Sequence, residues 1–246
     1  MRYLTPEIVK NKQIVMRVDF NVDFDNRGNI IDDFRIQRTL PTIKFLQDNQ
    51  AKKIILISHL GRPQEENNFQ KFTLKPIQLY LEKLLDKKVY FIEDFLKEKQ
   101  EINEIPSGNI ILLENIRFYP GEEKNDINFA KQLSELGDLY INEAFSVSHH
   151  QAASLNAITK FLPAYAGFLL KEEIDSLDKI KNISGGKLVI ILGGAKIKDK
   201  LPLIDAFINK AQYVLVGGAL ANTIIKSWNF EVGKSWIDQD MLEQAK

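Results

Sequence analysis

The sequence predicts an α/β protein in which helices cover both faces of a mostly parallel β-sheet, a three-layer αβα arrangement. Short, continuously apolar runs rich in Val, Ile and Leu recur along the chain, as in the buried strands of parallel sheets. Stretches with helical spacing separate these runs, and strands that alternate with helices form βαβ units. The predicted strands are Gln13–Val18, Lys53–Ser58, Val89–Ile92, Asn109–Leu113, Leu139–Asn142, Leu188–Leu192 and Tyr213–Val216.

The intervening helices are predicted from apolar residues that repeat every three or four positions. In Leu74–Leu85, for example, leucines and an isoleucine share one face. The other stretches of this kind are Ile127–Leu136, Glu172–Ile183 and Leu201–Lys210.

The amphipathic stretch Leu169–Lys181 is followed by Ser184-Gly185-Gly186 and then a new strand, so we expect it to link two domains. We place an amino-terminal domain at residues 1–168, a linker helix at 169–183 and a second domain at 184–246. The second domain has only two predicted strands, too few to bury both faces of a parallel sheet. Because the chain also ends inside a helical pattern, we expect it to be a fragment or truncated product of something longer.

Charge and composition narrow the classes of function. The 33 basic and 33 acidic side chains cancel, which removes the main argument for non-specific nucleic-acid binding. Cysteine is absent, which excludes disulfides and thiolate metal sites and agrees with a reducing compartment. No apolar run has the length of a signal-peptide core or a membrane span. We therefore expect a cytoplasmic protein without a nucleic-acid or membrane partner.

Polar side chains follow four of the predicted strands, at the point where each strand ends. In a parallel sheet these ends meet at one edge, where ligands bind. Arginines and histidines gathered there in a neutral protein indicate a pocket for a small, multiply charged anion. For each arginine alone, an ordinary solvated or ion-paired surface position is the alternative. The groups are Arg17, Asp19 and Asn21; Ser58–Pro63; Glu114–Phe118; and Asn142–Phe145 with the pair His149 and His150.

Glycine pairs follow both strands of the second domain. Gly193-Gly194 leads through Lys196 and Lys200 into a predicted helix, and Gly217-Gly218 follows the next strand. Glycines permit close backbone approach, a helix start offers free N–H groups, and lysines add charge, which favours phosphate. An ordinary glycine turn is the alternative, because the sequence has neither the P-loop nor the G-x-G-x-x-G spacing.

The histidine pair does not predict a metal site. Three histidines without cysteine, and no HExxH motif, make zinc improbable. Adjacent histidines on an extended segment also point to opposite sides, so we expect one metal ion not to take both. We predict no bound metal.

Taken in order, the strand-end segments resemble the signature blocks of the phosphoglycerate kinase family. Six ordered blocks between residues 17 and 223 make the resemblance specific. Arg17–Val22 resembles RVDFNVP, Asp33–Ile36 with Leu40–Ile43 resembles DxxRI…LPTI, Ser58–Pro63 matches SHLGRP, Glu114–Phe118 with Gly121-Glu122 matches ENxRFxxGE, Gly193–Lys200 matches GGAKxxDK, and Gly217–Thr223 is similar to GGGMANT.

The resemblance implies a glycolytic phosphotransferase that passes a phosphoryl group reversibly between 1,3-bisphosphoglycerate and ADP, giving 3-phosphoglycerate and ATP. The amino-terminal domain would bind 3-phosphoglycerate, and an incomplete, Rossmann-like second domain would bind Mg-ADP or Mg-ATP as substrate, in a monomer. One alternative is a truncated, weakly active or inactive remnant that keeps the anion pocket. Another is an unrelated α/β anion-binding protein.

The resemblance also assigns roles to residues. Arg35 and Lys196 would be catalytic and stabilise the phosphoryl group in flight, since charge stabilisation supplies most of the catalysis in such transfers. Lys196, Lys200, Gly217 and Gly218 would bind nucleotide. The substrate-binding set would be Asp19, Phe20, Asn21, Arg35, His59, Leu60, Gly61, Arg62, Arg117 and His150, with Asp19 and Asn21 at the hydroxyl and carboxylate end and His59, Arg62 and Arg117 around the 3-phosphate.

Two features depart from the family pattern. Asn142–Ser154 aligns with NDAFGTAHRAHAS or a near variant, and there His150 replaces a phosphate-binding arginine and Ala152 a histidine. Because a free imidazole loses its charge at about pH 6.5, we expect affinity for 3-phosphoglycerate to fall as the pH rises through that range. The family's glycine-rich GTGGGA-type loop and acidic ribose contact would lie beyond Lys246, so we expect weak nucleotide binding.

Overall fold

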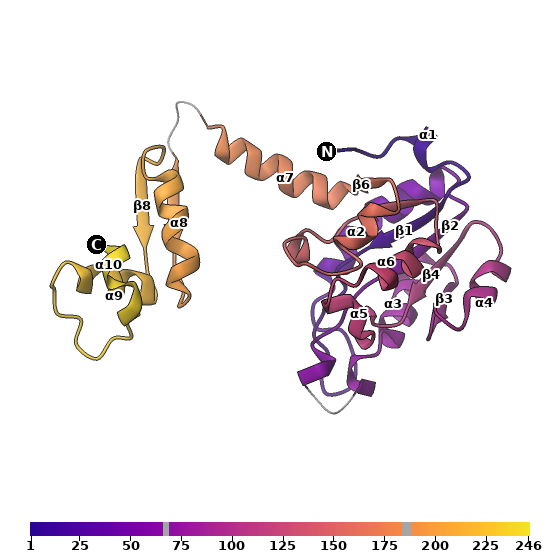
Figure 1. Ribbon diagram of the computed structural model, residues 1–246, viewed down its shortest axis with the longest axis horizontal. Coiled ribbons are helices and arrows are strands. Elements are labelled where there is room, and N and C mark those ends of the chain that lie inside the picture. The colour runs from indigo at the N-terminus through magenta and orange to yellow at the C-terminus, as the bar shows by residue number, and fades with distance from the viewer. Residues whose placement is uncertain (66–68, 184–187) are drawn as a thin grey trace. The chain divides into compact units, whose positions relative to one another are not determined.

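The computed structural model describes residues 1–65, 69–183 and 188–246. These residues form two compact units, Met1–Asp175 and Ser176–Lys246, and the boundary between the units falls inside helix α7 (Phe168–Lys181) (Figure 1). The predicted start of the second domain, with Ser184-Gly185-Gly186, lies outside the described residues.

The first unit contains a six-stranded sheet in which every strand pair is parallel, in the order β3-β4-β2-β1-β5-β6. The five strands predicted for this part of the chain are confirmed. The sixth was not predicted, because three residues that include two alanines carry no recognisable pattern. The strands are β1 (Gln13–Arg17), β2 (Lys53–Ile57), β3 (Val89–Ile92), β4 (Asn109–Leu113), β5 (Leu139–Asn142) and β6 (Ala164–Ala166).

Alternate residues of these strands feed two separate hydrophobic clusters, one on each face of the sheet. In β1, Ile14 and Met16 belong to one cluster and Val15 to the other. The first cluster includes side chains of α2 and α3, and the second includes side chains of α4 and α6. Both faces are therefore buried, which confirms the predicted three-layer αβα arrangement and explains why the strands are continuously apolar.

Helix α2 (Phe34–Asp48) was not predicted. Pro41 lies inside it, and a proline within a helix removes one backbone hydrogen bond. The helix forms because Ile36, Ile43 and Leu46 are completely buried against the sheet. The other helices of this unit are α1 (Pro6–Val9), α3 (Lys75–Leu85), α4 (Lys99–Glu104), α5 (Pro120–Glu123) and α6 (Ile127–Ser134), with 3-10 turns η1 (Pro63–Glu65), η2 (Phe69–Phe72), η3 (Ile116–Phe118), η4 (Phe145–Val147) and η5 (Ala157–Lys160).

The strand order places a topological switch at β1. The chain builds β2, β3 and β4 on one side of β1 and then returns to place β5 on the other side. In open parallel sheets, ligands bind at the carboxyl ends of the strands beside such a switch. The loops after β1 and β5 therefore form the edge at which a site is expected.

The second unit has a two-stranded parallel sheet with a small core formed by Ile197, Leu201 and Leu220. On the strands, Val189, Ile191, Tyr213 and Leu215 are 47–77% exposed. This exposure agrees with the expectation that two strands cannot bury both faces of a parallel sheet. The elements are β7 (Val189–Leu192), α8 (Ile197–Phe207), β8 (Tyr213–Val216), α9 (Gly218–Ser227), η6 (Gln239–Met241) and α10 (Leu242–Ala245).

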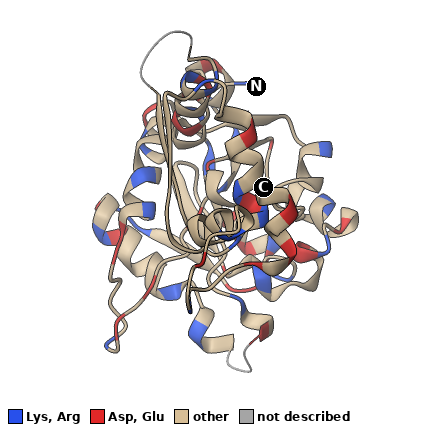
Figure 2. Cartoon of the chain, turned by 90° about the vertical axis from the view of Figure 1, so that its left-hand side faces the viewer, with Lys and Arg blue, Asp and Glu red and all other residues tan. Residues whose placement is uncertain are grey.

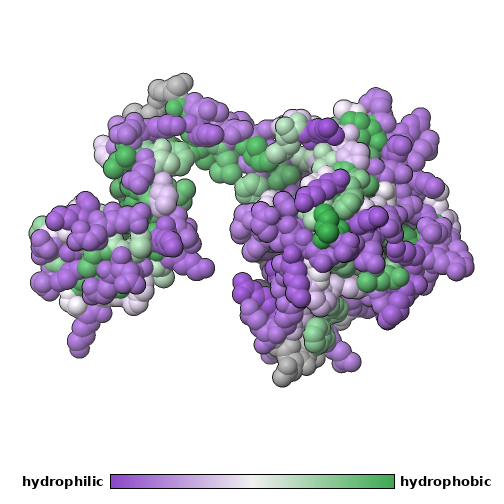
Figure 3. Space-filling model, viewed as in Figure 1, coloured by the Kyte–Doolittle hydropathy of each residue, from purple (hydrophilic) through white to green (hydrophobic). Residues whose placement is uncertain are grey.

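Most of the surface in Figure 3 is hydrophilic, with apolar side chains visible along α7. Leu177 and Ile180 of that helix are 51% and 41% exposed. In the part of the chain that the structure describes, no helix is both long enough and apolar enough to cross a membrane.

Candidate functional site

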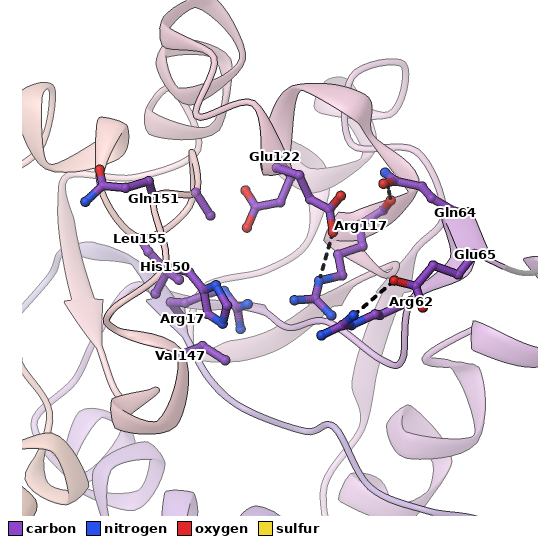
Figure 4. Close-up of a pocket in the computed structure, with 12 residues that line it drawn as sticks. Arg17, Arg62, Gln64, Glu65, Arg117, Glu122, Val147, His150, Gln151 and Leu155 are labelled. Atoms are coloured by element: carbon purple, nitrogen blue, oxygen red, sulfur yellow. Dashed lines mark hydrogen bonds and ion pairs between the residues drawn. The ribbon is translucent and has the colours of Figure 1, made fainter. Parts of the chain in front are cut away.

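A cavity of about 300 Å³ opens at the carboxyl edge of the six-stranded sheet (Figure 4). Four basic side chains point into it from four different segments: Arg17 at the end of β1, Arg62 after β2, Arg117 in η3 and His150 after β5. The prediction that Arg62, Arg117 and the histidines meet at this edge is confirmed for Arg62, Arg117 and His150, whereas His59 and His149 do not line the cavity. The other lining residues are Gln64, Glu65, Glu122, Glu123, Val147, Gln151, Ala152 and Leu155.

The charge of this cavity is a local feature. Lys and Arg residues are interspersed with Asp and Glu over the ribbon in Figure 2, as the net charge of zero requires. Attraction of an anion by this protein must therefore come from side chains that converge on one place.

Arg117 is held in place by its own loop. The side chain of Asn115 is completely buried, donates to the carbonyls of Leu60 and Phe72, and accepts from the backbone N–H of Arg117. The guanidinium of Arg117 donates to the carbonyl of Gly61 at 2.7 Å. The loops after β2 and β4 are thus joined to each other, which fixes where the Arg117 charge lies.

Gly61 is the residue that allows the segment after β2 to pack against Phe72 of η2. Its φ of +54° lies in the left-handed region, and an added Cβ would lie 2.5 Å from Cδ1 of Phe72. The backbone N–H of Gly61 also donates to Oδ1 of Asn21 at 2.8 Å. A larger residue at position 61 would displace both Asn21 and Arg117 from their present contacts.

Arg62 differs from Arg117 in being exposed. Its ion pair with Glu65, at 3.0 Å, joins two side chains that are each more than 60% exposed, and such pairs contribute little. The guanidinium of Arg62 can therefore turn toward a bound anion at little energetic cost.

His59 lies behind the cavity and is not among the residues that line it. The side chain is buried, and burial lowers the pKa of its imidazole to about 2, with the positive charges of Arg17, Arg117 and Arg35 adding to the effect. His59 is therefore neutral at physiological pH. Its Nδ1 lies 3.1 Å from the guanidinium of Arg17.

Sequence reasoning placed Arg17 at this edge but gave it no role, and it missed Glu122. Both side chains are only 2% exposed and both line the cavity. Burial is the largest cause of the lowered pKa of Arg17 and of the raised pKa of Glu122, and each pKa is partly restored by the charge of the other residue. A charged residue at the end of a continuously apolar strand, as Arg17 is, was the available signal.

A second pocket, of about 210 Å³, is lined by two of the predicted substrate residues, Asp19 and Arg35, whereas Asn21, Leu60 and Gly61 line a third pocket. In the second pocket, Asp19 accepts from the guanidinium of Arg35 at 2.7 Å and from the hydroxyl of Ser146. Phe20 and Leu60 are buried in the core, so only their backbone atoms are available to a ligand. The structure thus brings Asp19 and Arg35 together near, but not inside, the basic cavity.

The same pocket contains Glu143, which occupies the position of the aspartate in the family block. Its Oε1 accepts from the hydroxyl of Thr42 at 2.6 Å and from the backbone N–H of Leu169 at 3.0 Å. Glu143 thereby caps the first turn of α7, where Gly167 has no side chain to do so. Burial raises the pKa of Glu143 to about 7.

The predicted nucleotide residues lie in the second unit, at the carboxyl ends of β7 and β8. Lys196 precedes α8, Lys200 lies within it, and Gly217 and Gly218 begin α9. The two glycine turns are adjacent, because a Cβ on Gly218 would lie 3.9 Å from the backbone nitrogen of Gly194. A Cβ on Gly217 would meet nothing within 4 Å, so the turns leave open space around their backbone.

The expectation that His149 and His150 point to opposite sides is wrong. Their ring centroids lie 4.2 Å apart and the rings are tilted by 34°, because both residues occupy a turn after η4 and not an extended segment. Among the described residues, no group of three or more His, Asp or Glu side chains could hold a metal ion. Burial and then His149 lower the pKa of His150.

A sequence model of phosphoglycerate kinase matches residues 5–246. The chain belongs to the phosphoglycerate kinase family. A phosphoglycerate kinase of Coprothermobacter proteolyticus is 42% identical over 248 residues, which cover 100% of this chain and 63% of that protein. The family resemblance drawn from the six sequence blocks is therefore confirmed.

Solved structures of phosphoglycerate kinases share the fold. That from Coxiella burnetii has a TM-score of 0.82 and 35% identity, covering 96% of this chain and 59% of that one. The enzyme from Pyrococcus horikoshii OT3 has a TM-score of 0.84 and 30% identity, covering 100% of this chain and 64% of that one. The chain thus spans about 60% of the length of the phosphoglycerate kinases it matches.

Proposed function

We propose that the first unit binds 3-phosphoglycerate and that the protein carries out the phosphoglycerate kinase reaction, in which a phosphoryl group passes between 1,3-bisphosphoglycerate and ADP. The observation that carries this proposal is the convergence of Arg17, Arg62, Arg117 and His150 on one cavity. In this proposal residues 1–168 are the substrate domain, 169–183 the linker helix and 184–246 part of the nucleotide domain. Because glycolysis takes place in the cytoplasm, we place the protein there, as a monomer.

The basic cavity suits the 3-phosphate of the ligand. Guanidinium groups form charge-assisted, two-pronged hydrogen bonds with phosphate oxygens, and Arg62 and Arg117 offer such groups from two joined loops. His59, buried behind them, adds a neutral imidazole. Arg62 and Arg117 provide the positive charge that a phosphate needs once it leaves water.

The neighbouring pocket suits the glycerate end. Asp19 offers oxygen atoms to hydroxyl hydrogens there, and Asn21 offers its oxygen from a third pocket. Arg35, already paired with Asp19, offers a cation to a carboxylate or transferring phosphoryl group. The backbone groups of Phe20, Leu60 and Gly61 lie on the same two loops. We assign Arg35 a catalytic role because phosphoryl transfer is accelerated mainly by cations placed where charge spreads.

We assign ADP or ATP, with its Mg²⁺, to the glycine turns of the second unit. The open space at Gly194 and Gly217, the free N–H groups at the start of α8 and the charges of Lys196 and Lys200 fit a polyphosphate. Lys196 joins Arg35 in stabilising the phosphoryl group, and Lys200, Gly217 and Gly218 contact the nucleotide phosphates. Bound Mg²⁺ would come with the nucleotide and neutralise phosphate charge.

A second candidate function is that of an anion-binding remnant without turnover. The exposed apolar strand face of the second unit favours it. Such a protein would keep the cavity of the first unit and bind phosphoglycerate, but it would not position a nucleotide well enough to react.

Calorimetric titration of the chain with 3-phosphoglycerate tests the proposal, with glycerate as the control that lacks the phosphate. We expect 3-phosphoglycerate to bind at least about tenfold more tightly than glycerate, and Arg117→Met to remove that difference. Binding together with ATP formation from 1,3-bisphosphoglycerate and ADP supports the kinase, and binding without ATP formation supports the remnant. Equal affinity for both ligands would overturn both functions.

A further inference from the structure

A row of buried hydrogen bonds runs behind the basic cavity, from α5 to His59. The carboxylate of Glu122 accepts from the hydroxyl of Ser154 at 2.6 Å and from its backbone N–H at 2.8 Å. The Ser154 hydroxyl in turn accepts from Nε of Arg17 at 2.9 Å, and another nitrogen of Arg17 lies 3.1 Å from Nδ1 of His59. Each of the four residues is at most 2% exposed, although they come from four separate segments.

The direction of donation along this row follows from the chemistry of its members. A guanidinium has five N–H donors and no acceptor, so Arg17 must donate to Ser154, to the carbonyl of Val18 and to His59. The Ser154 hydroxyl, which already accepts from Arg17, then gives its single hydrogen to Glu122. With Glu122 as a carboxylate, the donor and the acceptor of each hydrogen bond in the row are therefore fixed.

That polarity fixes the state of His59. Because Arg17 can only donate, Nδ1 of His59 must present its lone pair. Burial and the neighbouring cations Arg17, Arg117 and Arg35 oppose a charged imidazole, and Asp19 is 4.0 Å away, beyond hydrogen-bond reach. The single proton of the neutral ring therefore belongs on Nε2.

We propose that Glu122, Ser154 and Arg17 are positioning residues that hold His59 in its neutral Nε2–H form, in which Nδ1 accepts from Arg17 and helps to keep that guanidinium in the basic cavity. The opposite tautomer would turn an N–H toward the guanidinium of Arg17 and lose this hydrogen bond. Glu122 is part of this arrangement because the hydroxyl of Ser154 connects its carboxylate to the buried guanidinium of Arg17 by two hydrogen bonds. The tautomer itself is independent of the proposed function, whereas its effect on affinity rests on phosphoglycerate being the ligand.

Nitrogen NMR of the chain with ¹⁵N-labelled histidine measures the tautomer directly. A variant with His149→Gln and His150→Gln leaves His59 as the single histidine and so assigns its signals. We expect Nε2 to carry the proton and Nδ1 to have the shift of an unprotonated nitrogen, with no titration between about pH 5.5 and about pH 8. A proton on Nδ1, or a titration near the ordinary histidine pKa, would overturn the proposal.

Substitutions of Ser154 separate positioning from simple packing. Ser154→Ala removes the hydroxyl between Glu122 and Arg17, so we expect a mixture of His59 tautomers and an affinity for 3-phosphoglycerate about tenfold weaker. Ser154→Thr keeps the hydroxyl and should restore both readouts. Ser134→Ala, which removes another buried hydroxyl whose partner is the carbonyl of Lys131, is the matched control and should change neither.

The outcomes of these experiments test the positioning role and the proposed function separately. If Ser154→Ala weakens binding but leaves the tautomer unchanged, the row only packs the site and the proposal is wrong. If Ser154→Ala does not fold, Glu122→Gln, which keeps an acceptor for Ser154 but removes the charge, gives the same two readouts. If the unmodified chain has the Nε2–H tautomer yet binds no phosphoglycerate, the proposed function fails while the positioning role stands.

Discussion

Glycines and charged residues follow the strands in both units, but they are tightly packed in the first unit and open in the second. In the first unit Arg17, Asn115 and Glu122 are buried and hydrogen-bonded, and Gly61 is pressed against Phe72. In the second unit the glycine turns are open, and no side-chain cap bonds the start of α8 or α9 among the described residues. Packing thus sets the shape of the first site before any ligand arrives, whereas the second offers backbone donors whose arrangement packing does not enforce.

The largest difference between the two units is expected in the unfolding free energy when alanine replaces one glycine in each of them. Gly61→Ala combines a left-handed φ with overlap of the Phe72 ring, and we expect it to lower the unfolding free energy by about 4 kcal/mol. Gly217 has a φ of −141° and open space around it, so Gly217→Ala should change the unfolding free energy by less than about 0.5 kcal/mol. Urea unfolding followed by circular dichroism measures both. Equal losses in the two variants would mean that the turns do not differ in packing.

A smaller effect concerns the buried carboxyl of Glu143. The pKa of Glu143 is raised from 4.5 to about 7, so the folded state holds the proton more tightly than the unfolded state does. Stability should therefore fall as the pH rises from about 4.5 to about 7, by about 3 kcal/mol at most, and then level off. Glu143→Gln does not titrate, so its unfolding free energy should lack this decline.

The measurement is the difference in unfolding free energy between Glu143→Gln and the unmodified chain at about pH 5 and about pH 8. Glu122, whose pKa is also raised, contributes equally to both proteins. A pH-independent difference for Glu143→Gln would show that burial does not raise the pKa of this carboxyl.

The smallest effect concerns His150, the histidine that lines the basic cavity. Burial and its cationic neighbours lower the pKa of His150, so the charge is lost at a lower pH than in a free histidine. Anions favour the charged form, so affinity for 3-phosphoglycerate should fall as the pH rises through that range. At about pH 8, His150→Arg should bind about tenfold more tightly, close to 1.4 kcal/mol.

Comparing the isotherms of the two proteins at each pH cancels the ionisation of the phosphate itself. Lys198→Met removes a permanent charge from the second unit and should leave both isotherms unchanged. If His150→Arg and the parent have the same pH dependence, His150 is not a phosphate ligand, and the cavity relies on its arginines alone.

The sheet of the first unit could be predicted because its strands are apolar on both faces, and such strands appear in the sequence as continuous apolar runs. The convergence of Arg62, Arg117 and His150 followed from parallel strand order. Helix α2 could not be predicted, since Pro41 argues against a helix and only tertiary burial of residues such as Ile43 overrides it. The position of Arg17 at the end of an apolar strand was a signal, but its partners and the buried role of Glu122 were not predictable, because a sequence pattern does not say which charged side chain has a partner from a distant segment.

The cap that Glu143 places on α7 ties together two positions that are 24 residues apart. A Cβ on Gly167 would lie 2.5 Å from the carboxyl carbon of Glu143, so a side chain at position 167 would force that carboxylate to shift from its contacts with Thr42 and Leu169. The family block has the shorter aspartate at the first position, which would free that space. Positions 143 and 167 are therefore coupled: the cost of exchanging Gly167 depends on which residue stands at 143.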